Sequence, residues 1–282
     1  QVNTITTAID SALINYNVIA ADNTSTVNLV MGIILAILVA MILLGGIKRI
    51  GQVTEKLVPF MALFYIILAV GVVIINWKNV PGVFSAIIRG AFNPASVTGG
   101  VVGSFFMSMK KGVSRGIFSN EAGLGTGSIA HACADTRKPV KQGFFGIFEV
   151  FTDTIVICTL TALVILCVAG SGTASEFGAE NGASLTSLCF FTALGSPGGY
   201  AVAVCVVLFA FSTIIAWYYM GRQAAEYLGG KISGRIPAVY TVGYLLAAFF
   251  GCLGAMETVW EVSDIFNGLM AVPNLAALVL LA

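Results

Sequence analysis

Two adjacent hydroxyl residues, Ser212 and Thr213, lie in the middle of a long apolar stretch of the chain, residues 199–228. Adjacent hydroxyls inside an apolar helix can supply hard oxygen ligands to a small cation, and the backbone carbonyl of Phe209, one turn earlier, can join them. Ser and Thr hydroxyls in helices also bond back to a carbonyl of the preceding turn. The pair therefore predicts either an ion site or a local hydrogen bond, and the local bond is the simpler interpretation.

Trp217 follows Thr213 by four residues, so the two side chains share one face of a helix. An indole one turn from an ion site can form the wall of an apolar pocket. A tryptophan that is simply buried, or that lies at a membrane interface, is an equally good interpretation.

Two carboxylates, Glu149 and Asp153, are spaced i and i+4 at the start of another apolar stretch, residues 143–169. A carboxylate within the hydrocarbon region is costly and usually marks an ion or proton path. We predict that Asp153 is an ion ligand, a proton carrier or a packing partner. Glu149 is nearer the end of the stretch, where it can reach the interface.

Glycines are concentrated in the apolar segment 94–128. Each glycine costs a helix about 1 kcal/mol relative to alanine, so the cluster predicts a helix that breaks over residues 98–104. Broken backbone in a bilayer lines a cavity and points to a substrate site, whereas close packing through small residues is the alternative. Residues 121–128 are better explained as a cytoplasmic loop. The substrate-contacting residues expected in the break are Thr98, Gly99, Gly100, Val101 and Gly103.

The composition indicates a polytopic helical membrane protein. Hydrophobic residues make up 58% of the 282 positions and charged residues 10%, and the mean hydropathy is +0.96. Soluble domains carry about 25% charged residues. The net charge of +1 gives no indication of a nucleic-acid partner.

Catalytic, nucleotide and metal chemistry lack support in the sequence. No nucleophile, base and orienting residue form a recognisable set, so an enzyme is not expected. The glycines of 123–127 follow no strand and precede no Gly-Lys-Ser/Thr, which argues against nucleotide binding. The cysteines lack CxxC spacing, and the single histidine, His131, has no ligand-like neighbours, so no metal cofactor is expected.

The chain as a whole predicts an all-α fold of membrane-spanning helices. Residues 1–25 read as the tail of a preceding helix and an external loop, and Trp77 as an interfacial anchor. Residues 81–92 and 185–194 are helical but too short to span. The expected spans are 27–47, 58–77, the broken segment 94–118, 143–169, 199–228, 237–255, and 262–282 with a kink at Pro273.

Basic residues alternate between the two sides of these spans. Twelve of the 14 lysines and arginines fall in residues 48–57, 110–141 and 222–236. By the positive-inside rule these segments are cytoplasmic loops of a multi-pass protein in the lipid bilayer of the cell membrane.

Several stretches resemble the alanine or glycine:cation symporter family, also called sodium:alanine symporters. The most specific is GIFSNEAGLGTGSIAH at 116–131. Supporting stretches are GGIKRIGQVTEKLVPFM at 45–61, PVKQG at 139–143, FAFSTI at 209–214 and FNGLMAVPN at 266–274. The resemblance implies a LeuT-type fold of two inverted five-helix repeats. In this fold residues 1–282 form a single membrane transporter domain, truncated at both ends and holding about the fourth to tenth helices.

The resemblance also implies a function, a symporter that couples inward sodium flow to the uptake of a small neutral amino acid, alanine or glycine. Ser212, Thr213 and the Phe209 carbonyl would bind sodium, a co-transported ligand rather than a cofactor. Trp217 would line the side-chain pocket, and residues 98–104 would be unwound. Many family members carry an aromatic residue near Val101, so this chain could admit a larger side chain. Proton coupling through Asp153, and a channel or non-transporting scaffold, are the alternatives.

Overall fold

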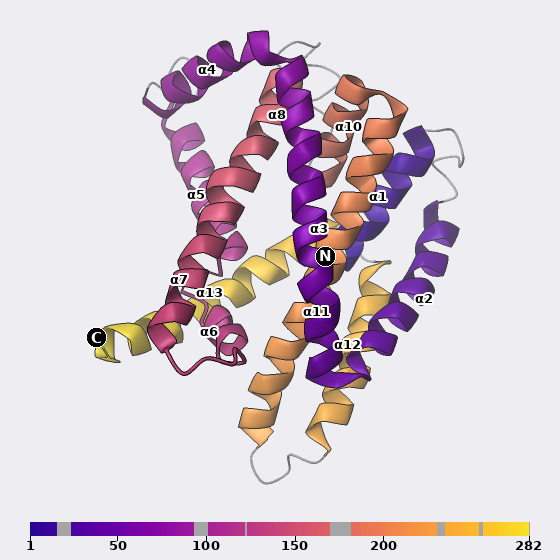
Figure 1. Cartoon of the computed structure of the whole chain (residues 1–282), viewed down its shortest axis with the longest axis vertical. Coiled ribbons are helices and arrows are strands. Elements are labelled where there is room, and N and C mark those ends of the chain that lie inside the picture. The colour runs from indigo at the N-terminus through magenta and orange to yellow at the C-terminus, as the bar shows by residue number, and fades with distance from the viewer. Residues whose placement is uncertain are drawn as a thin grey trace. The chain divides into compact units, whose positions relative to one another are not determined.

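The computed structural model describes residues 1–15, 24–92, 101–121, 123–169, 182–229, 235–253 and 256–281. Every regular element in these ranges is helical, which confirms the all-α prediction (Figure 1). The elements are α1 (Val2–Asn15), α2 (Thr24–Leu43), α3 (Gly46–Ile75), η2 (Trp77–Asn79), α4 (Val80–Phe92), α5 (Val101–Ser119), α6 (Thr126–His131), α7 (Pro139–Val150), η4 (Phe151–Cys158), α8 (Thr159–Ala169), α10 (Ala183–Leu194), α11 (Ser196–Gly229), α12 (Ile236–Gly251) and α13 (Met256–Leu281).

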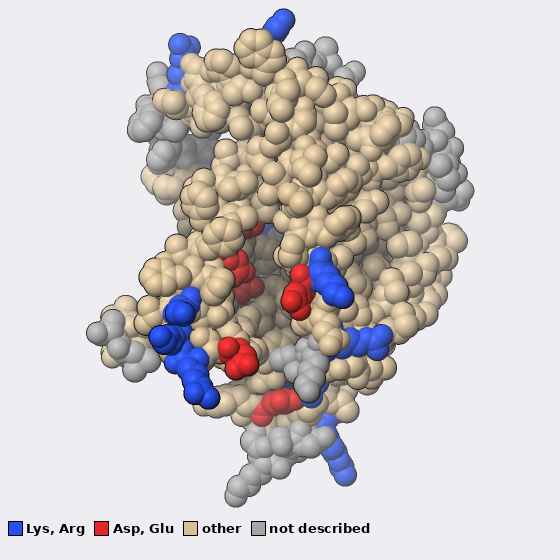
Figure 2. Space-filling model, in the orientation of Figure 1, with Lys and Arg blue, Asp and Glu red and all other residues tan. Residues whose placement is uncertain are grey.

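Five helical stretches among the described residues are long and apolar enough to cross a membrane, so the chain is a polytopic membrane protein. Much of the face shown in Figure 2 is uncharged, as a lipid-facing surface must be. Two further apolar helices, α10 and α12, are shorter. The five stretches are Thr24–Leu43, Arg49–Ile75, Pro139–Ala169, Ser196–Gly229 and Glu261–Leu280.

The chain divides into two compact units. Unit 1 comprises Gln1–Ala69 and Ser175–Thr258, and unit 2 comprises Val70–Ala174 and Val259–Ala282. Each is described by itself below. The single domain expected over residues 1–282 stays a prediction.

Unit 1 is built around α11, which packs against α1, α2, α10 and α12. Large apolar residues of α11 are buried against aliphatic side chains of α1 and α2. Because α11 is apolar over most of its surface, it can be buried by neighbours on several sides. The core cluster includes Ile5, Leu35, Val39, Leu43, Ala210, Ile214, Ile215 and Tyr218.

Helix α2 approaches α12 closely at Gly32. A Cβ atom at this position would lie 3.3 Å from the Cβ of Cys252 and 3.3 Å from the Phe249 ring. Such contacts are tighter than ordinary van der Waals distances. Small residues at helix interfaces let backbones approach and gain dispersion energy when apolar burial is no longer a driving force.

In unit 2, α7, η4 and α8 form one continuous helix, Pro139–Ala169, whose middle part is a π-helix over Phe151–Cys158. Helix α4 packs against α8 through Val83, Leu163 and Cys167. The Asn79 amide nitrogen, just before α4, donates a 2.9 Å hydrogen bond to the Cys167 carbonyl. Residues 80–92 are helical, in agreement with the sequence prediction.

The prediction of a helix break over residues 98–104 is wrong for residues 101–104, because α5 is already helical from Val101. Residues 98–100 lie outside the described part of the chain. An isolated glycine such as Gly103 costs a helix only about 1 kcal/mol. An unpaired backbone group in an apolar medium costs several kcal/mol, so the helix continues through it.

The predicted loop boundaries need a second correction. Residues 48–57 lie within α3, residues 110–119 within α5, and residues 222–229 within α11. Basic side chains show where the chain reaches water. Lys, Arg, Glu and Gln are also good helix formers, so a helix can continue through the charged residues that follow its apolar part. Pro273 lies inside α13, which continues through it; the kink stays a prediction.

We predict that Gly32→Leu pushes α2 away from α12 and destabilises the protein by about 1–3 kcal/mol, as overpacking of a tight interface does. Thermal unfolding in detergent measures the change. Gly51→Leu is the matched control, because Gly51 is also helical and a Cβ there meets nothing within 4 Å. Equal stability of the two variants would contradict the close packing of α2 on α12.

Candidate functional site

The hydroxyls of Ser212 and Thr213 both point at the carbonyl of Phe209. Ser212 Oγ donates to this oxygen at 2.8 Å and Thr213 Oγ1 donates at 2.9 Å. The local hydrogen bonds expected from the sequence are therefore present. Each hydroxyl oxygen keeps two lone pairs when it donates. The three oxygens predicted as sodium ligands thus lie together in mid-helix, and the ion itself stays a prediction.

The surroundings of this pair in unit 1 are apolar and aromatic. Ser212 is 7% exposed, and its Oγ lies 3.8 Å from the sulfur of Met61. The ring of Tyr65 packs edge-on against Phe209, with centroids 5.9 Å apart. Because the local dielectric is low, the dipoles of these oxygens would act on a nearby charge more strongly than they would in water.

Thr213 and Trp217 line one cavity of about 230 Å³ in unit 1, which confirms that they share a helical face. Tyr244 and Ala248 of α12 also line it. The Tyr244 hydroxyl donates a 2.7 Å hydrogen bond to the Ile214 carbonyl and so holds α12 against α11 beside the cavity. Sequence reasoning missed Tyr244, because nothing in its local pattern says which helix it faces.

The proposed substrate-contacting residues are the part of the site that the structure describes least. Thr98, Gly99 and Gly100 lie outside the described residues, and Val101 and Gly103 are described only as backbone at the start of α5. Their role in binding a substrate stays a prediction.

In unit 2, Asp153 lies in the π-helix and contacts the end of α5. Its Oδ2 accepts a hydrogen bond from Ser119 Oγ at 2.5 Å. The adjacent Thr154 donates to Asn120 Oδ1 at 2.8 Å. Ser119, the last residue of α5, and Asn120, which follows it, are therefore paired with the consecutive residues Asp153 and Thr154 of η4. The role of Asp153 as an ion or proton site stays a prediction.

Glu149 takes part in a different contact. Its Oε2 lies 3.5 Å from Nε2 of His131, and the other ring nitrogen of His131 lies 2.8 Å from the Gln142 side-chain nitrogen. The Glu149 side chain is 72% exposed. This agrees with the expectation that it reaches the surface rather than the interior of the span.

The turn between α5 and α6 brings α13 close to the backbone. Gly123 and Gly125 have φ values of 78° and 83°, in the left-handed region that favours glycine. A Cβ at Gly125 would lie 2.7 Å from Asn274 Oδ1, and Asn274 Nδ2 donates to the Gly123 carbonyl at 2.8 Å. The glycines therefore allow a tight turn and the approach of an asparagine.

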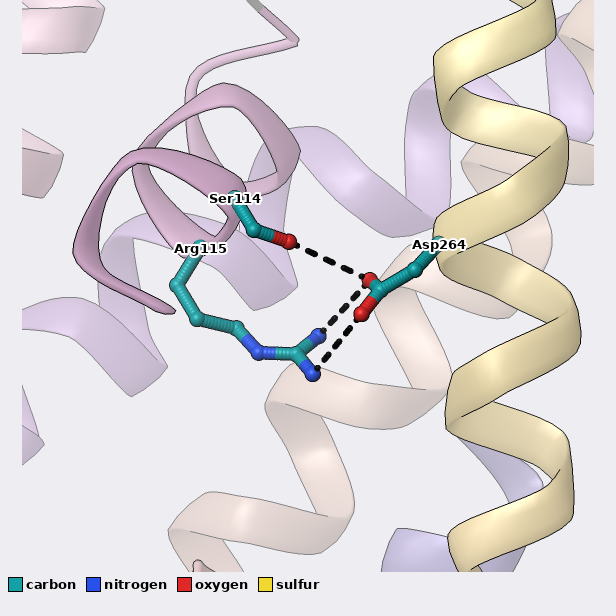
Figure 3. Close-up of polar contacts among 3 residues, drawn as sticks. All are labelled: Ser114, Arg115 and Asp264. Atoms are coloured by element: carbon teal, nitrogen blue, oxygen red, sulfur yellow. Dashed lines mark hydrogen bonds and ion pairs between the residues drawn. The ribbon is translucent and has the colours of Figure 1, made fainter. Parts of the chain in front are cut away.

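A second contact joins α5 and α13 within unit 2 (Figure 3). Both terminal nitrogens of Arg115 lie 3.4 Å from the carboxylate oxygens of Asp264, and Ser114 Oγ donates to the same carboxylate at 3.4 Å. The two charged side chains are 37% and 34% exposed. Partly exposed pairs of this kind contribute little stability, so the contact chiefly orients the two helices.

Burial raises the pKa of the Glu121 carboxyl above its usual range. The hydrogen bond from Thr126 Oγ1, at 2.7 Å, and the nearby His131 oppose the rise, whereas the charge of Glu149 adds to it. Glu121 is also the non-glycine residue with a positive φ, 50°, among those described. The residue is thus held in an unfavourable backbone conformation and an unfavourable environment for its charge.

The sodium:alanine symporter family model matches residues 1–282. The chain is 41% identical over 262 residues to the sodium/alanine symporter AgcS of Methanococcus maripaludis, covering 93% of this chain and 56% of that protein. It is 36% identical over 282 residues to the probable sodium/glutamine symporter GlnT of Bacillus subtilis, covering 100% and 55%. It is 34% identical over 264 residues to the sodium/proton-dependent alanine carrier protein of Bacillus sp. PS3, covering 90% and 59%. The chain spans little more than half the length of these relatives.

We predict that Glu121→Gln stabilises the protein at neutral pH. With a raised pKa, the folded state keeps its proton at pH values where the unfolded chain has lost it, so Glu121 lowers stability as pH rises through this interval. Glutamine carries no charge to desolvate. Thermal unfolding from acid to neutral pH should show wild type and variant alike in acid and diverging above it. Asp135→Asn, at an exposed loop residue, is the control. A constant difference at all pH values would contradict the prediction.

Proposed function

Because the chain belongs to the sodium:alanine symporter family, we propose that the protein couples inward sodium flow to the uptake of a small neutral amino acid, alanine or glycine. The family consists of transporters rather than enzymes. The proposal needs two elements in the apolar interior, an oxygen site for sodium and an apolar wall for the amino-acid side chain.

The observation that carries the proposal is the convergence of Ser212 Oγ and Thr213 Oγ1 on the Phe209 carbonyl. Sodium is a hard cation and takes oxygen ligands. Three neutral oxygens on one helix supply half of a coordination shell of about six, so a facing element has to supply the remainder. A site assembled from two parts is suited to coupling, because ion binding then favours the conformation in which the parts meet.

Trp217, which lines a cavity with Thr213, would limit the size of the substrate's side chain. A bulky indole leaves space for a methyl group or a hydrogen and excludes larger side chains by overlap. We place the amino acid's charged groups against the backbone amides and carbonyls at Thr98, Gly99, Gly100, Val101 and Gly103. One relative is named a probable sodium/glutamine symporter. If this protein also takes a larger amino acid, Val101 is the residue that would make room for it, because valine is smaller than an aromatic residue.

The same proposal assigns a fold and an orientation. Residues 1–282 supply about the fourth to tenth helices of a LeuT-type transporter, with residues 48–57, 110–141 and 222–236 toward the cytoplasm. The support for the orientation is the distribution of basic residues.

Proton coupling through Asp153 is the second candidate. It is favoured by a carboxylate within a candidate membrane span and by a relative named as sodium/proton-dependent. In that mechanism alanine uptake would follow a pH gradient and ignore sodium.

We predict that Thr213→Ala, in the complete protein in proteoliposomes, raises the sodium concentration for half-maximal alanine uptake about tenfold, the effect of losing about 1.4 kcal/mol of ligand binding. Thr192→Ala is the control, because Thr192 of α10 makes the same kind of hydrogen bond, to the Leu188 carbonyl at 2.8 Å. Unchanged sodium activation in Thr213→Ala would remove this residue from the site. Uptake driven by a proton gradient alone would favour the second candidate.

We predict that Trp217→Ala widens substrate preference, improving transport of larger neutral amino acids relative to alanine about tenfold, as pocket contacts of this size do. Competition of unlabelled amino acids against radiolabelled alanine measures the ranking. Trp77→Ala serves as the control, since Trp77 is 65% exposed. If Trp217→Ala ranks the competitors as wild type does, the indole contributes only packing.

A further inference from the structure

Helices α11 and α12 lie against each other in unit 1, and tyrosine rings fill part of the space between them. The rings of Tyr218, Tyr240 and Tyr244 pack together, with centroids 5.4, 5.8 and 5.9 Å apart. Tyr218 Oη lies 2.7 Å from Thr241 Oγ1. Because Thr241 gives its own hydrogen to the Pro237 carbonyl, Tyr218 is the donor in this pair. Aromatic packing and a hydrogen bond therefore hold this part of α12 against α11.

The side of α12 that faces α11 changes its character further along the helix. The hydrogen bond from Tyr244 Oη to the Ile214 carbonyl, 2.7 Å long, places Tyr244 on this side. A helix repeats every 3.6 residues, so the next positions on the same side are Ala247 and Ala248. The side chains that α12 presents to α11 therefore change from tyrosine to alanine within one turn.

The cavity of about 230 Å³ lies where this change occurs. Tyr244, Ala247 and Ala248 line it from α12, and Thr213 and Trp217 line it from α11. Protein interiors are close-packed, and an alanine fills much less of the space between two helices than a tyrosine does. The two alanines therefore leave space open beside α11. The cavity has two walls, an indole on α11 and a pair of methyl groups on α12.

The wall on α12 is suited to a small, uncharged group. Helix α12 contains no charged residue, and an unpaired charge is costly to bury, so this wall fits a neutral side chain. Ala248 is 7% exposed, so protein atoms surround its methyl group. A longer side chain at this position has to extend into the cavity. The size of the residue at position 248 therefore sets how much of the cavity is free.

We propose that α12 limits the size of the transported amino acid, with Ala247 and Ala248 as specificity-determining residues and Tyr244 as a positioning residue. This inference rests on the proposed function and extends it, because Trp217 bounds the substrate's side chain from one direction only. Tyr244 acts through the backbone of α11. Its hydrogen bond to the Ile214 carbonyl fixes the position of α12 along α11, and so the distance from the two alanines to the indole.

Uptake of radiolabelled alanine by the complete protein in proteoliposomes tests the proposal. In Ala248→Leu the added side chain fills part of the cavity, so the half-saturating alanine concentration should rise about tenfold, as it does when a pocket no longer admits a methyl group. Glycine lacks this methyl group and should compete against alanine better than it does in wild type. The sodium concentration for half-maximal uptake should stay unchanged. Ala238→Leu, at an exposed position of α12, is the control and should behave as wild type.

Ala247→Leu tests the same wall even if Ala248→Leu does not fold. Ala247 is exposed and lines the cavity, so a leucine there reaches the cavity without overpacking a buried position. The half-saturating alanine concentration should again rise relative to that of glycine.

Tyr244→Phe keeps the ring and removes the hydrogen bond to α11. The released wall should let larger neutral amino acids compete against alanine roughly fivefold better, the effect of one net hydrogen bond. A loss of stability alone lowers the amount of active protein and leaves the ranking of competitors unchanged. Tyr240→Phe is the control, because the described residues that line the cavity do not include Tyr240.

The outcome for α12 is separable from the outcome for the proposed function. If Ala247→Leu and Ala248→Leu rank the competitors as wild type does, while Trp217→Ala changes the ranking, the inference is overturned and the proposed function stands. If wild type shows no sodium-driven uptake, the proposed function is overturned and this inference with it. A reduced preference for alanine over glycine in both alanine variants, with unchanged sodium activation, supports the wall on α12.

Discussion

In an apolar medium every polar group of a helix has to find its partner inside the protein, and this constraint shapes the whole chain. Many of the described threonines satisfy it locally, by donating to the carbonyl four residues earlier. Thr213 does the same, and Ser212 adds a second hydroxyl to the same oxygen, as Thr6 and Thr7 both do at the Asn3 carbonyl. A common way of satisfying a hydroxyl thereby brings three oxygen atoms close together. The same local bond is made by Thr7, Thr54, Thr152, Thr161, Thr186, Thr192 and Thr241.

Polar groups that are not satisfied locally connect helices instead. Asn79 bonds to the Cys167 carbonyl, Asn274 to that of Gly123 and Tyr244 to that of Ile214. Apolar contacts between helices have little directional preference, so a single hydrogen bond of this kind fixes which turns face each other. Each such bond lies within one unit, so each unit has its own defined packing.

The end of α5 is the region where these contacts are densest in unit 2. Asn274 donates a hydrogen bond to the Gly123 carbonyl in the turn after α5. The residues at the end of α5 contact Asp153 and Thr154, and Arg115 of α5 pairs with Asp264. This turn belongs to the stretch that most resembles the symporter family. Its glycines allow the close approach of α13. Its Glu121 has a positive φ and a partly buried carboxyl.

The sequence by itself determined the helical class, most of the apolar spans, the short helix predicted over 81–92, and the shared face of Thr213 and Trp217. These features follow from the period of a single helix, which operates over a few residues. The tertiary structure decided which side chains meet across elements: Ser119 with Asp153, Asn274 with Gly123, and Tyr244 with Ile214. It also decided that α5 begins by Val101 and that residues 48–57 are helical. Pairing between distant residues and the exact ends of helices depend on the free energy of packing against neighbours, which local periodicity does not contain.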